Sequence, residues 1–373
     1  MRGKRARHAL VCAALTLAVL GVAAACGGRG ARPAPSTPIA VAPPPAAGAM
    51  PAPDASSAAV PHLAAGDHWR DVPLDGRTRR YLVHVPAALD TTRPVPVVLA
   101  FHGGATNAKS MREFSGLDAT ADARGFLAVY PEGTGRLPRL LTFNAGNCCG
   151  YAREQGVDDV AFVRAVLDDL ATLQVIDARR VYATGMSNGA MLAHRVGAEL
   201  ADRIAAIAPV AGPLGIDLAA VPPARAVPVM HVHGTADAFA PYAGGQGRGL
   251  TDTNFLSVDE TVAAWRRVDG CPETPAIEVL PDADGDGQRV TRTTWGPGRD
   301  GAEVVLVSIE GGGHTWPGHA SRLELLGAVS HDLDVNNAMW EFFERHPLPG
   351  AAAMSAAAAE QEREQPAAAA ETR

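Results

Sequence analysis

Apolar runs alternate with amphipathic stretches throughout residues 66–346. Unbroken apolar runs, which suit strands covered on both faces, occur in "PVPVVLAFHGG" at 94–104 and in "IAAIAPVAG" at 204–212. Residues 157–174 instead repeat apolar side chains at helical spacing after Asp158, which is a favourable N-cap. The same patterns predict further strands at 78–86, 125–133, 179–185, 226–237 and 302–314, and further helices at 109–124, 188–200, 257–268 and 335–346.

This alternation predicts the fold class. Strands that alternate with helices favour an α/β fold, in which a mostly parallel central sheet carries helices on both faces. On such sheets the reactive residues gather at the carboxyl ends of the strands. Candidate residues are therefore expected in the loops that follow the predicted strands.

The N-terminus has the pattern of a targeting segment. Residues 1–25 combine a basic start with an apolar run, and small residues stand directly before Cys26. They resemble a bacterial lipoprotein-type signal peptide that leaves Cys26 lipidated, although Ala23 stands where leucine is usual. Plain secretion and an uncleaved membrane anchor are the alternatives. Each of the three places the folded domain outside the cytoplasm.

Two segments of biased composition flank the domain. Residues 26–65 are rich in proline and alanine, and residues 347–373 are rich in alanine and glutamate. Neither segment can bury enough apolar surface to offset the entropy of ordering it. We expect a tether at 26–65, one folded domain at 66–346 and a disordered tail at 347–373.

The charge and the cysteine content limit which partners and which disulfides are possible. The formal net charge is −7 and the basic residues form no patch, so nucleic acid is not an expected partner. Beyond Cys26 the chain holds Cys148, Cys149 and Cys271, which permits at most one disulfide. A ring between the adjacent pair would be strained, so a link from one of the pair to Cys271 is expected.

Three residues of complementary type follow three of the predicted strands. Ser187 lies in "GMSNG" between a strand and a helix, the context of a nucleophile elbow. Asp237 follows the strand in 226–237, and His314 follows the last strand. A nucleophilic serine needs a base, and the base needs an orienting acid. Singly, the three could be a helix cap, a turn aspartate and a loop histidine, but their order and placement together predict a triad.

The same reasoning predicts an oxyanion hole. One donor is the backbone N–H of Asn188, directly after Ser187. The second is expected in "FHGG", where glycines let the backbone approach a reacting carbonyl closely, and Gly104 is our candidate.

Several motifs together resemble one known family. "GMSNGAM", "HGTAD", "GGGHTWPG", "IAPVAG" and "NAGNCCG…VDDVAFVRAVLDDL" are similar to motifs of the polyhydroxybutyrate depolymerase and feruloyl esterase-like family of secreted α/β-hydrolases, over nearly all of 66–346. The resemblance implies an α/β-hydrolase fold and a triad of Ser187, Asp237 and His314. It also implies substrate contacts from Trp316, Asn144 and Tyr242, and requires no cofactor or metal.

The chain departs from that family in two respects. Ala198 stands where many relatives have cysteine, and "WGPGRDG" at 295–301 lacks another cysteine that is common in relatives. No separate polymer-binding module is recognisable, so soluble esters are better expected substrates than insoluble polymer.

Three other signals have simpler explanations. "GGATNAKS" imitates a phosphate loop but has Ala108 in place of its second glycine. "DADGDG" at 282–287 begins like a calcium loop, but Thr293 occupies the position of the final glutamate, which favours a polar turn. His231 and His233 share a strand face that would suit a metal, yet no third ligand is evident, which favours a packed strand.

The sequence thus predicts a monomeric extracytoplasmic serine esterase that hydrolyses hydroxyalkanoate oligomers or feruloyl- or acetyl-type esters through an acyl-enzyme. The alternatives are a non-catalytic tethered binding lipoprotein on the same fold and, less favoured, a serine peptidase.

Overall fold

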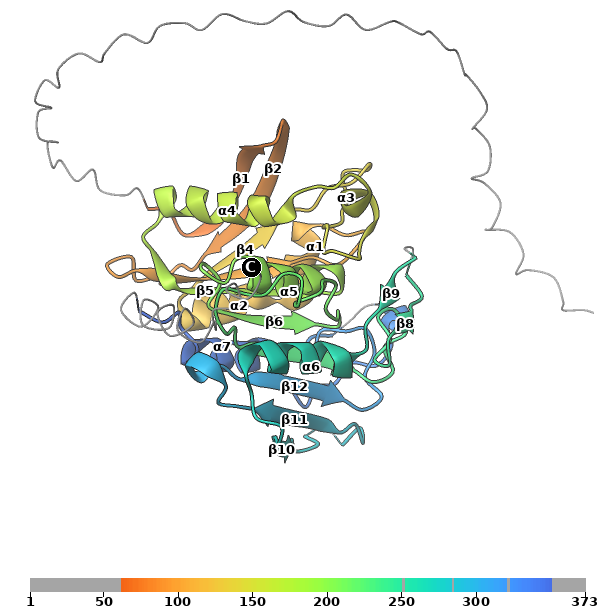
Figure 1. The fold of residues 1–373 in the computed structure, drawn as a ribbon. Helices are drawn as coiled ribbons and strands as arrows, with labels where there is room; N and C mark the ends of the chain where they lie inside the picture. The colour runs from red at the N-terminus through yellow and green to blue at the C-terminus, as the bar shows by residue number, and fades with distance from the viewer. Residues whose placement is uncertain (1–61, 250–251, 284, 321–322, 351–373) are drawn as a thin grey trace, which may run out of the picture. The chain divides into compact units, whose positions relative to one another are not determined.

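A ten-stranded sheet forms the centre of the described chain (Figure 1). The computed structural model describes residues 62–249, 252–283, 285–320 and 323–350. The expectations for the signal peptide, for Cys26, for most of the tether and for nearly all of the tail lie outside these residues. Within them, no helix is long and apolar enough to cross a membrane.

The sheet is parallel in its middle and antiparallel at both edges. Its strand order is β1-β2-β4-β3-β5-β6-β7-β12-β11-β10, and the six strands from β4 to β12 in this order are parallel. This arrangement is an α/β-hydrolase sheet, as the sequence predicts. The strands are β1 (Gly66–Leu74), β2 (Arg77–Val85), β3 (Val95–Phe101), β4 (Leu127–Pro131), β5 (Ile176–Met186), β6 (Ala206–Val210), β7 (Val229–Gly234), β10 (Ala276–Val279), β11 (Val290–Trp295) and β12 (Val304–Ile309), with a separate pair β8 (Gly245–Gln246) and β9 (Asn254–Phe255).

Helices cover both faces of this sheet. One face carries α4 (Asp159–Leu173), α5 (Asn188–Glu199) and α6 (Val258–Asp269), which lie toward the viewer in Figure 1. The other carries α1 (Ala108–Ser115), α2 (Leu117–Arg124) and α7 (Val335–Arg345). Short helical turns complete the fold: α3 (Gly150–Glu154), Arg299–Gly301 and Glu324–Leu326.

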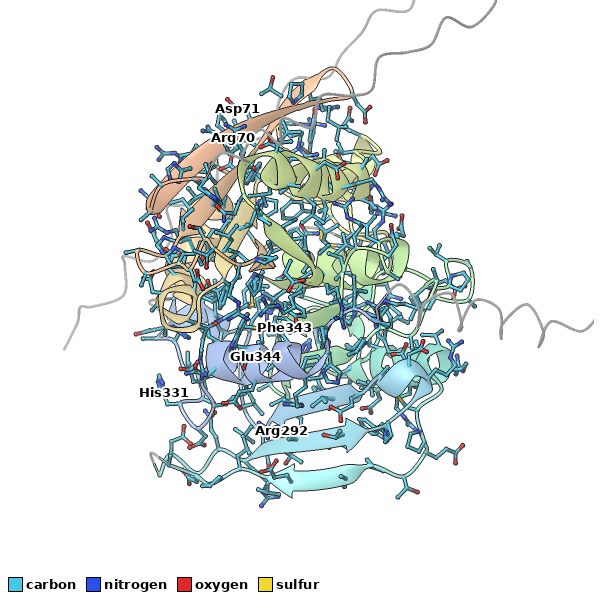
Figure 2. All side chains as sticks on the ribbon, turned by 90° about the vertical axis from the view of Figure 1, so that its left-hand side faces the viewer. Arg70, Asp71, Arg292, His331, Phe343 and Glu344 are labelled. Atoms are coloured by element: carbon cyan, nitrogen blue, oxygen red, sulfur yellow. A yellow bond between two sulfur atoms is a disulfide. The ribbon has the colours of Figure 1, made fainter. Side chains whose placement is uncertain are left out.

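The core has two halves because successive strand residues point to opposite faces. In β3, Val97 and Leu99 pack in the half that contains α4, α5 and α6, whereas Val98 packs in the half that contains α7. The helices bury only the side that faces the sheet. On α7, Phe343 is buried while the adjacent Glu344 is exposed (Figure 2).

The predicted helix at 109–124 is two helices. They meet at Gly116, whose φ of 59° ends α1 in the left-handed region. A Cβ at this position would lie 2.9 Å from His319 Nδ1, so both the backbone angle and the packing favour glycine.

The expected link from the adjacent cysteines to Cys271 is wrong. Cys148 and Cys149 are joined to each other in the loop before α3, and Cys271 is a free thiol. The reason is position: Cys271 follows α6, with its sulfur 3.9 Å from the carbonyl oxygen of Ala302, and so belongs to a different part of the sheet.

Candidate active site

Ser187 occupies a sharp turn between β5 and α5. Its backbone has φ 56° and ψ −120°, which is an uncommon conformation for a residue with a side chain. Its neighbours explain how the turn closes: a Cβ on Gly189 would lie 2.2 Å from the Phe101 carbonyl oxygen, and one on Gly185 would lie 2.6 Å from the Gly189 carbonyl oxygen. Only glycine fits at either position. Ser187 itself is partly exposed.

Asp237 and His314 form a buried pair. His314 Nδ1 lies 2.6 Å from Asp237 Oδ2, and the two residues are 6 % and 5 % exposed. The other carboxylate oxygen accepts the backbone N–H groups of Phe239 and Ala240, at 2.8 and 2.9 Å. Burial by itself raises the pKa of Asp237, but hydrogen bonds from His233 and His314 outweigh it and hold the pKa well below its usual range. The carboxylate is therefore charged and fixed in direction.

Ser187, Asp237 and His314 lie at one edge of the sheet. They follow β5, β7 and β12, which run parallel, so the carboxyl ends of all three strands meet there. Among the described side chains, no hydrogen bond joins Ser187 to His314; such bonds often tighten only in the substrate complex.

The loop after β3 packs against the turn at Ser187. A Cβ on Gly103 would lie 3.6 Å from Ser187 Cβ, and one on Gly104 would lie 3.7 Å from Asn188 Cβ. The N–H of Ala105 donates to the Leu141 carbonyl, whereas the N–H of Gly104 has no acceptor within the described chain. Asn188 begins α5, so its N–H is one of the first four that a helix leaves without an internal partner. Two donors thus flank the serine.

Comparison with known proteins assigns the chain to a family. The family model described as "Esterase PHB depolymerase" matches residues 80–243. "Putative esterase NocK" of Nocardia uniformis subsp. tsuyamanensis is 35% identical over 340 residues, which cover 88% of this chain and 96% of that protein. The chain belongs to the esterase PHB depolymerase family. It is a carboxylic ester hydrolase.

More distant similarities cover less of each protein. "Feruloyl esterase B" of Piromyces equi is 28% identical over 244 residues, which are 63% of this chain and 42% of that one. The solved acetyl xylan esterase of Aspergillus awamori is 14% identical with a TM-score of 0.49, over 74% of this chain and 99% of that chain.

His102 lies beside the candidate site and is not among the residues that the sequence predicts for it. Its ring is completely buried; Nδ1 donates to the Gly103 carbonyl at 2.8 Å, and Nε2 accepts the Gly133 N–H at 2.9 Å. The acceptor role of Nε2 requires a neutral ring, and burial lowers the pKa of His102 to about 4. His102 thereby fixes the loop that carries Gly104. Its only signal in the sequence is its place in "FHGG".

The side chain of Asn188 fixes a second loop. Its Oδ1 accepts the Phe143 N–H at 2.8 Å, and its Nδ2 donates to the Phe143 carbonyl at 3.0 Å. The next residue, Asn144, is also engaged in loop structure: its Nδ2 donates to the Val157 carbonyl, and its N–H donates to Asp159.

The other two expected substrate contacts differ in accessibility. Trp316 is fully buried, and its indole N–H donates to Asn336 Oδ1 at 2.9 Å, so its ring belongs to the core as the structure stands. Tyr242 is partly buried and meets the ring of His233 edge-on at 5.9 Å, next to the turn that holds Asp237.

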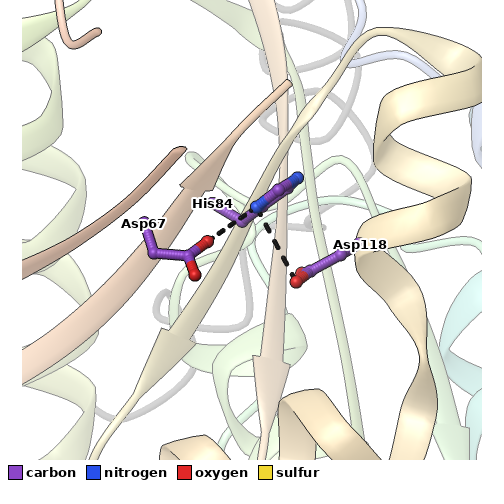
Figure 3. A group of neighbouring side chains, drawn as sticks. All are labelled: Asp67, His84 and Asp118. Atoms are coloured by element: carbon purple, nitrogen blue, oxygen red, sulfur yellow. Dashed lines mark hydrogen bonds and ion pairs between the residues drawn. The ribbon is translucent and has the colours of Figure 1, made fainter. Parts of the chain in front are cut away.

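A second group of titratable side chains lies on β1, β2 and α2 (Figure 3). His84 Nδ1 is 2.8 Å from Asp67 Oδ1 and 3.7 Å from Asp118 Oδ2. Such a set could hold a metal ion, but the guanidinium of Arg112 already contacts both aspartates. Burial lowers the pKa of His84, but the hydrogen bonds that its ring donates to Asp67 and Asp122 outweigh burial and raise the pKa. The group is an ion-pair network that ties the first two strands to α1 and α2.

Proposed function

We propose that the esterase works through a triad of Ser187, His314 and Asp237. His314 takes the proton of Ser187 as its oxygen attacks the ester carbonyl, and Asp237 holds the imidazole in place and stabilises its charged form. The N–H groups of Asn188 and Gly104 receive the negative oxygen of the tetrahedral intermediate. His314 then gives its proton to the departing alcohol. Water, activated by the same histidine, releases the acid from Ser187.

The buried 2.6 Å bond between His314 and Asp237 is the observation that carries this proposal. A carboxylate held by two backbone N–H groups and by the imidazole leaves only Nε2 of His314 free to face the nucleophile. The strained turn at Ser187 and the two unpaired N–H groups beside it supply the remaining parts.

We propose esters of hydroxyalkanoate oligomers or feruloyl- and acetyl-type esters as substrates. The family model is named for depolymerases of the first class, and one relative is named as a feruloyl esterase. The two classes differ in the acyl group, so hydrolysis of a feruloyl ester and of a hydroxybutyrate dimer under identical conditions distinguishes them.

We further propose that the protein acts outside the cytoplasm as a monomer. The signal-like segment 1–25 and Cys26 support an envelope anchor, residues 26–65 a tether, residues 66–346 the catalytic domain and residues 347–373 a tail. Labelling with a radioactive fatty acid, lost in a Cys26→Ser variant, tests the anchor. A soluble, unlabelled product in the culture medium would favour plain secretion instead.

Substitution of Ser187 tests the chemistry. We expect Ser187→Ala to lower kcat for p-nitrophenyl acetate and butyrate by about three orders of magnitude or more, because the nucleophile is lost. Thr172→Ala, which removes an exposed hydroxyl near the end of α4, is the control and should retain its rate.

Equal, slow turnover by folded wild type and Ser187→Ala would refute the triad. A tethered binding protein on the hydrolase fold would then explain the structure better. Turnover of peptides but not of esters would favour the peptidase alternative.

A further inference from the structure

Three buried histidines form a row that ends at Asp237. His194 lies on α5, and His231 and His233 lie on β7; each is at most 1 % exposed. His194 Nε2 is 3.3 Å from His231 Nδ1, and His231 Nε2 is 3.1 Å from His233 Nδ1. At the far end, His233 Nε2 lies 2.8 Å from the Ala240 carbonyl oxygen and 3.4 Å from Asp237 Oδ2.

A tryptophan fixes the direction of this row. Trp265 Nε1, on α6, lies 2.9 Å from His194 Nδ1, and an indole nitrogen can only donate. His194 Nδ1 must therefore accept, so the ring carries its proton on Nε2 and presents it to His231. The same argument repeats at each ring and leaves His233 with a proton on Nε2. The row thus begins at an obligate donor and ends at two obligate acceptors.

The row consists of neutral rings. Burial lowers the pKa of His194 to about 3, although a backbone hydrogen bond to Gly212 opposes this, and burial holds the pKa of His231 well below its usual range. A metal ion does not suit these rings, because both nitrogens of each are already used in hydrogen bonds.

The row connects the parts of the site. His194 lies on the helix that follows Ser187, and His231 and His233 lie on the strand that leads to Asp237. Trp265 lies on α6, which packs against β7 and β12. Neighbouring rings meet edge to edge in nearly parallel planes, with interplanar angles of 25° between His194 and His231 and 21° between His231 and His233. The hydrogen bonds between ring nitrogens therefore run along the row.

We propose that His194, His231 and His233, oriented by Trp265, are positioning residues that aim the N–H of His233 at the turn of Asp237. This inference rests on the proposed triad. His233 Nε2 donates to the carbonyl of Ala240, and the N–H of Ala240 binds the carboxylate of Asp237. The same N–H of His233 faces Asp237 Oδ2, the oxygen that His314 contacts. The row thereby restrains the carboxylate of Asp237 and weakens the electrostatic effect of that carboxylate on the imidazole of His314.

The direct test compares two substitutions of His233. His233→Leu removes the donor, whereas His233→Gln keeps an N–H in the same region. We expect His233→Leu to lower kcat about tenfold, in line with the loss of a hydrogen bond to a charged group, with KM little changed. The acid limb of its kcat/KM profile should move to higher pH, because a carboxylate without that donor stabilises the imidazolium of His314. His233→Gln should recover most of both effects.

A second comparison tests the row beyond His233. Trp265→Phe removes the N–H that orients His194, and we expect a smaller loss of kcat with the same direction of pH shift. Trp340→Phe is the matched control, because Trp340 is also a buried indole but its Nε1 has no hydrogen-bond partner within the described chain. Trp265, Asp237 and the ring of Tyr242 contact the row, and none of them is altered in the control.

Nitrogen-15 NMR of the imidazole rings tests the orientation without activity. We expect the Nε2–H form at all three histidines of the wild type. An Nδ1–H form at His233, or equal kcat and equal pH profiles for the leucine and glutamine variants, would overturn the proposal. So would identical behaviour of Trp265→Phe and Trp340→Phe. Failure of the triad itself is recognised separately, by full turnover in Ser187→Ala.

Discussion

At the scale of single residues, Ser187 shows how the chain places a reactive group. Its positive φ costs free energy, on the order of 1–3 kcal/mol for such a residue. The turn persists because Gly185 and Gly189 allow the strand and helix to close against the carbonyl of Phe101. The pattern of glycine on both sides of a serine therefore carries structural information as well as chemical information.

The charge state of Asp237 leads to a prediction about the pH dependence. Because its pKa is held well below the usual range, Asp237 stays ionised as the pH falls through the region where an imidazole gains a proton. We expect kcat/KM for p-nitrophenyl butyrate to fall with decreasing pH as a single protonation, that of His314. A profile that is flat between about pH 5 and 8 would contradict the role of His314 as base.

At the scale of elements, a buried ion pair joins β2 to α4 and to the loop beside the active site. Arg79 Nη2 lies 2.7 Å from Asp159 Oδ1 and also donates to the Glu132 carbonyl. The other oxygen of Asp159 accepts the N–H of Asn144, so three segments meet at one carboxylate. Burial raises the pKa of Asp159, although Arg79 opposes this shift.

Removal of that carboxylate should strongly destabilise the fold. Asp159→Ala leaves the Arg79 guanidinium buried without its partner, and we expect the free energy of unfolding in urea to fall by about 3–5 kcal/mol. Glu113→Ala is the control: its pair with Lys109 is about 70 % exposed, so removing it should change the free energy by about 0.5 kcal/mol or less. Similar losses in both variants would contradict this account.

Sequence patterns predict some elements better than others. The sequence predicts buried strands such as β3 and amphipathic helices such as α4. Burial on both faces of a strand gives an unbroken apolar run, and burial of one face of a helix gives apolar residues at helical spacing. The edge strand β10 is exposed along its whole length, so its sequence has no apolar pattern. The sequence does not predict β1 and β11 either, because both are only partly buried. The division between α1 and α2 depends on Gly116 and on His319, which is distant in the sequence.

At the scale of the whole molecule, Asp269 links folding to pH. One oxygen accepts the Val227 N–H at 2.9 Å, and the other is buried without a partner. Burial raises the pKa of Asp269 from 3.8 to about 7, although Val227, Arg299 and Arg225 oppose the shift. The fold therefore favours the protonated acid. Relative to the unfolded chain, it loses stability as the pH rises from 3.8 toward about 7.

Asp269→Asn should remove this dependence, because the amide keeps an acceptor for Val227 and carries no charge. We expect the variant to gain stability relative to wild type between pH 5 and pH 8, by about 4 kcal/mol at most. Urea unfolding at several pH values measures the difference. The exposed Asp71→Asn variant is the control and should follow the wild type at every pH (Figure 2). A constant difference between Asp269→Asn and wild type would refute the assignment.

The sequence by itself determined the fold class, the parallel centre of the sheet and the family, because periodic burial and short contiguous motifs are local properties. It also placed Ser187, Asp237 and His314 after three strands, and their catalytic role remains a prediction for the experiments above. Only the tertiary structure decided which cysteines pair, how His102 supports the loop of Gly104, and that Trp316 is buried in the core. It alone brings Trp265 and three histidines from α6, α5 and β7 into one row behind Asp237. These features join residues far apart in the chain, and no local pattern records such a contact.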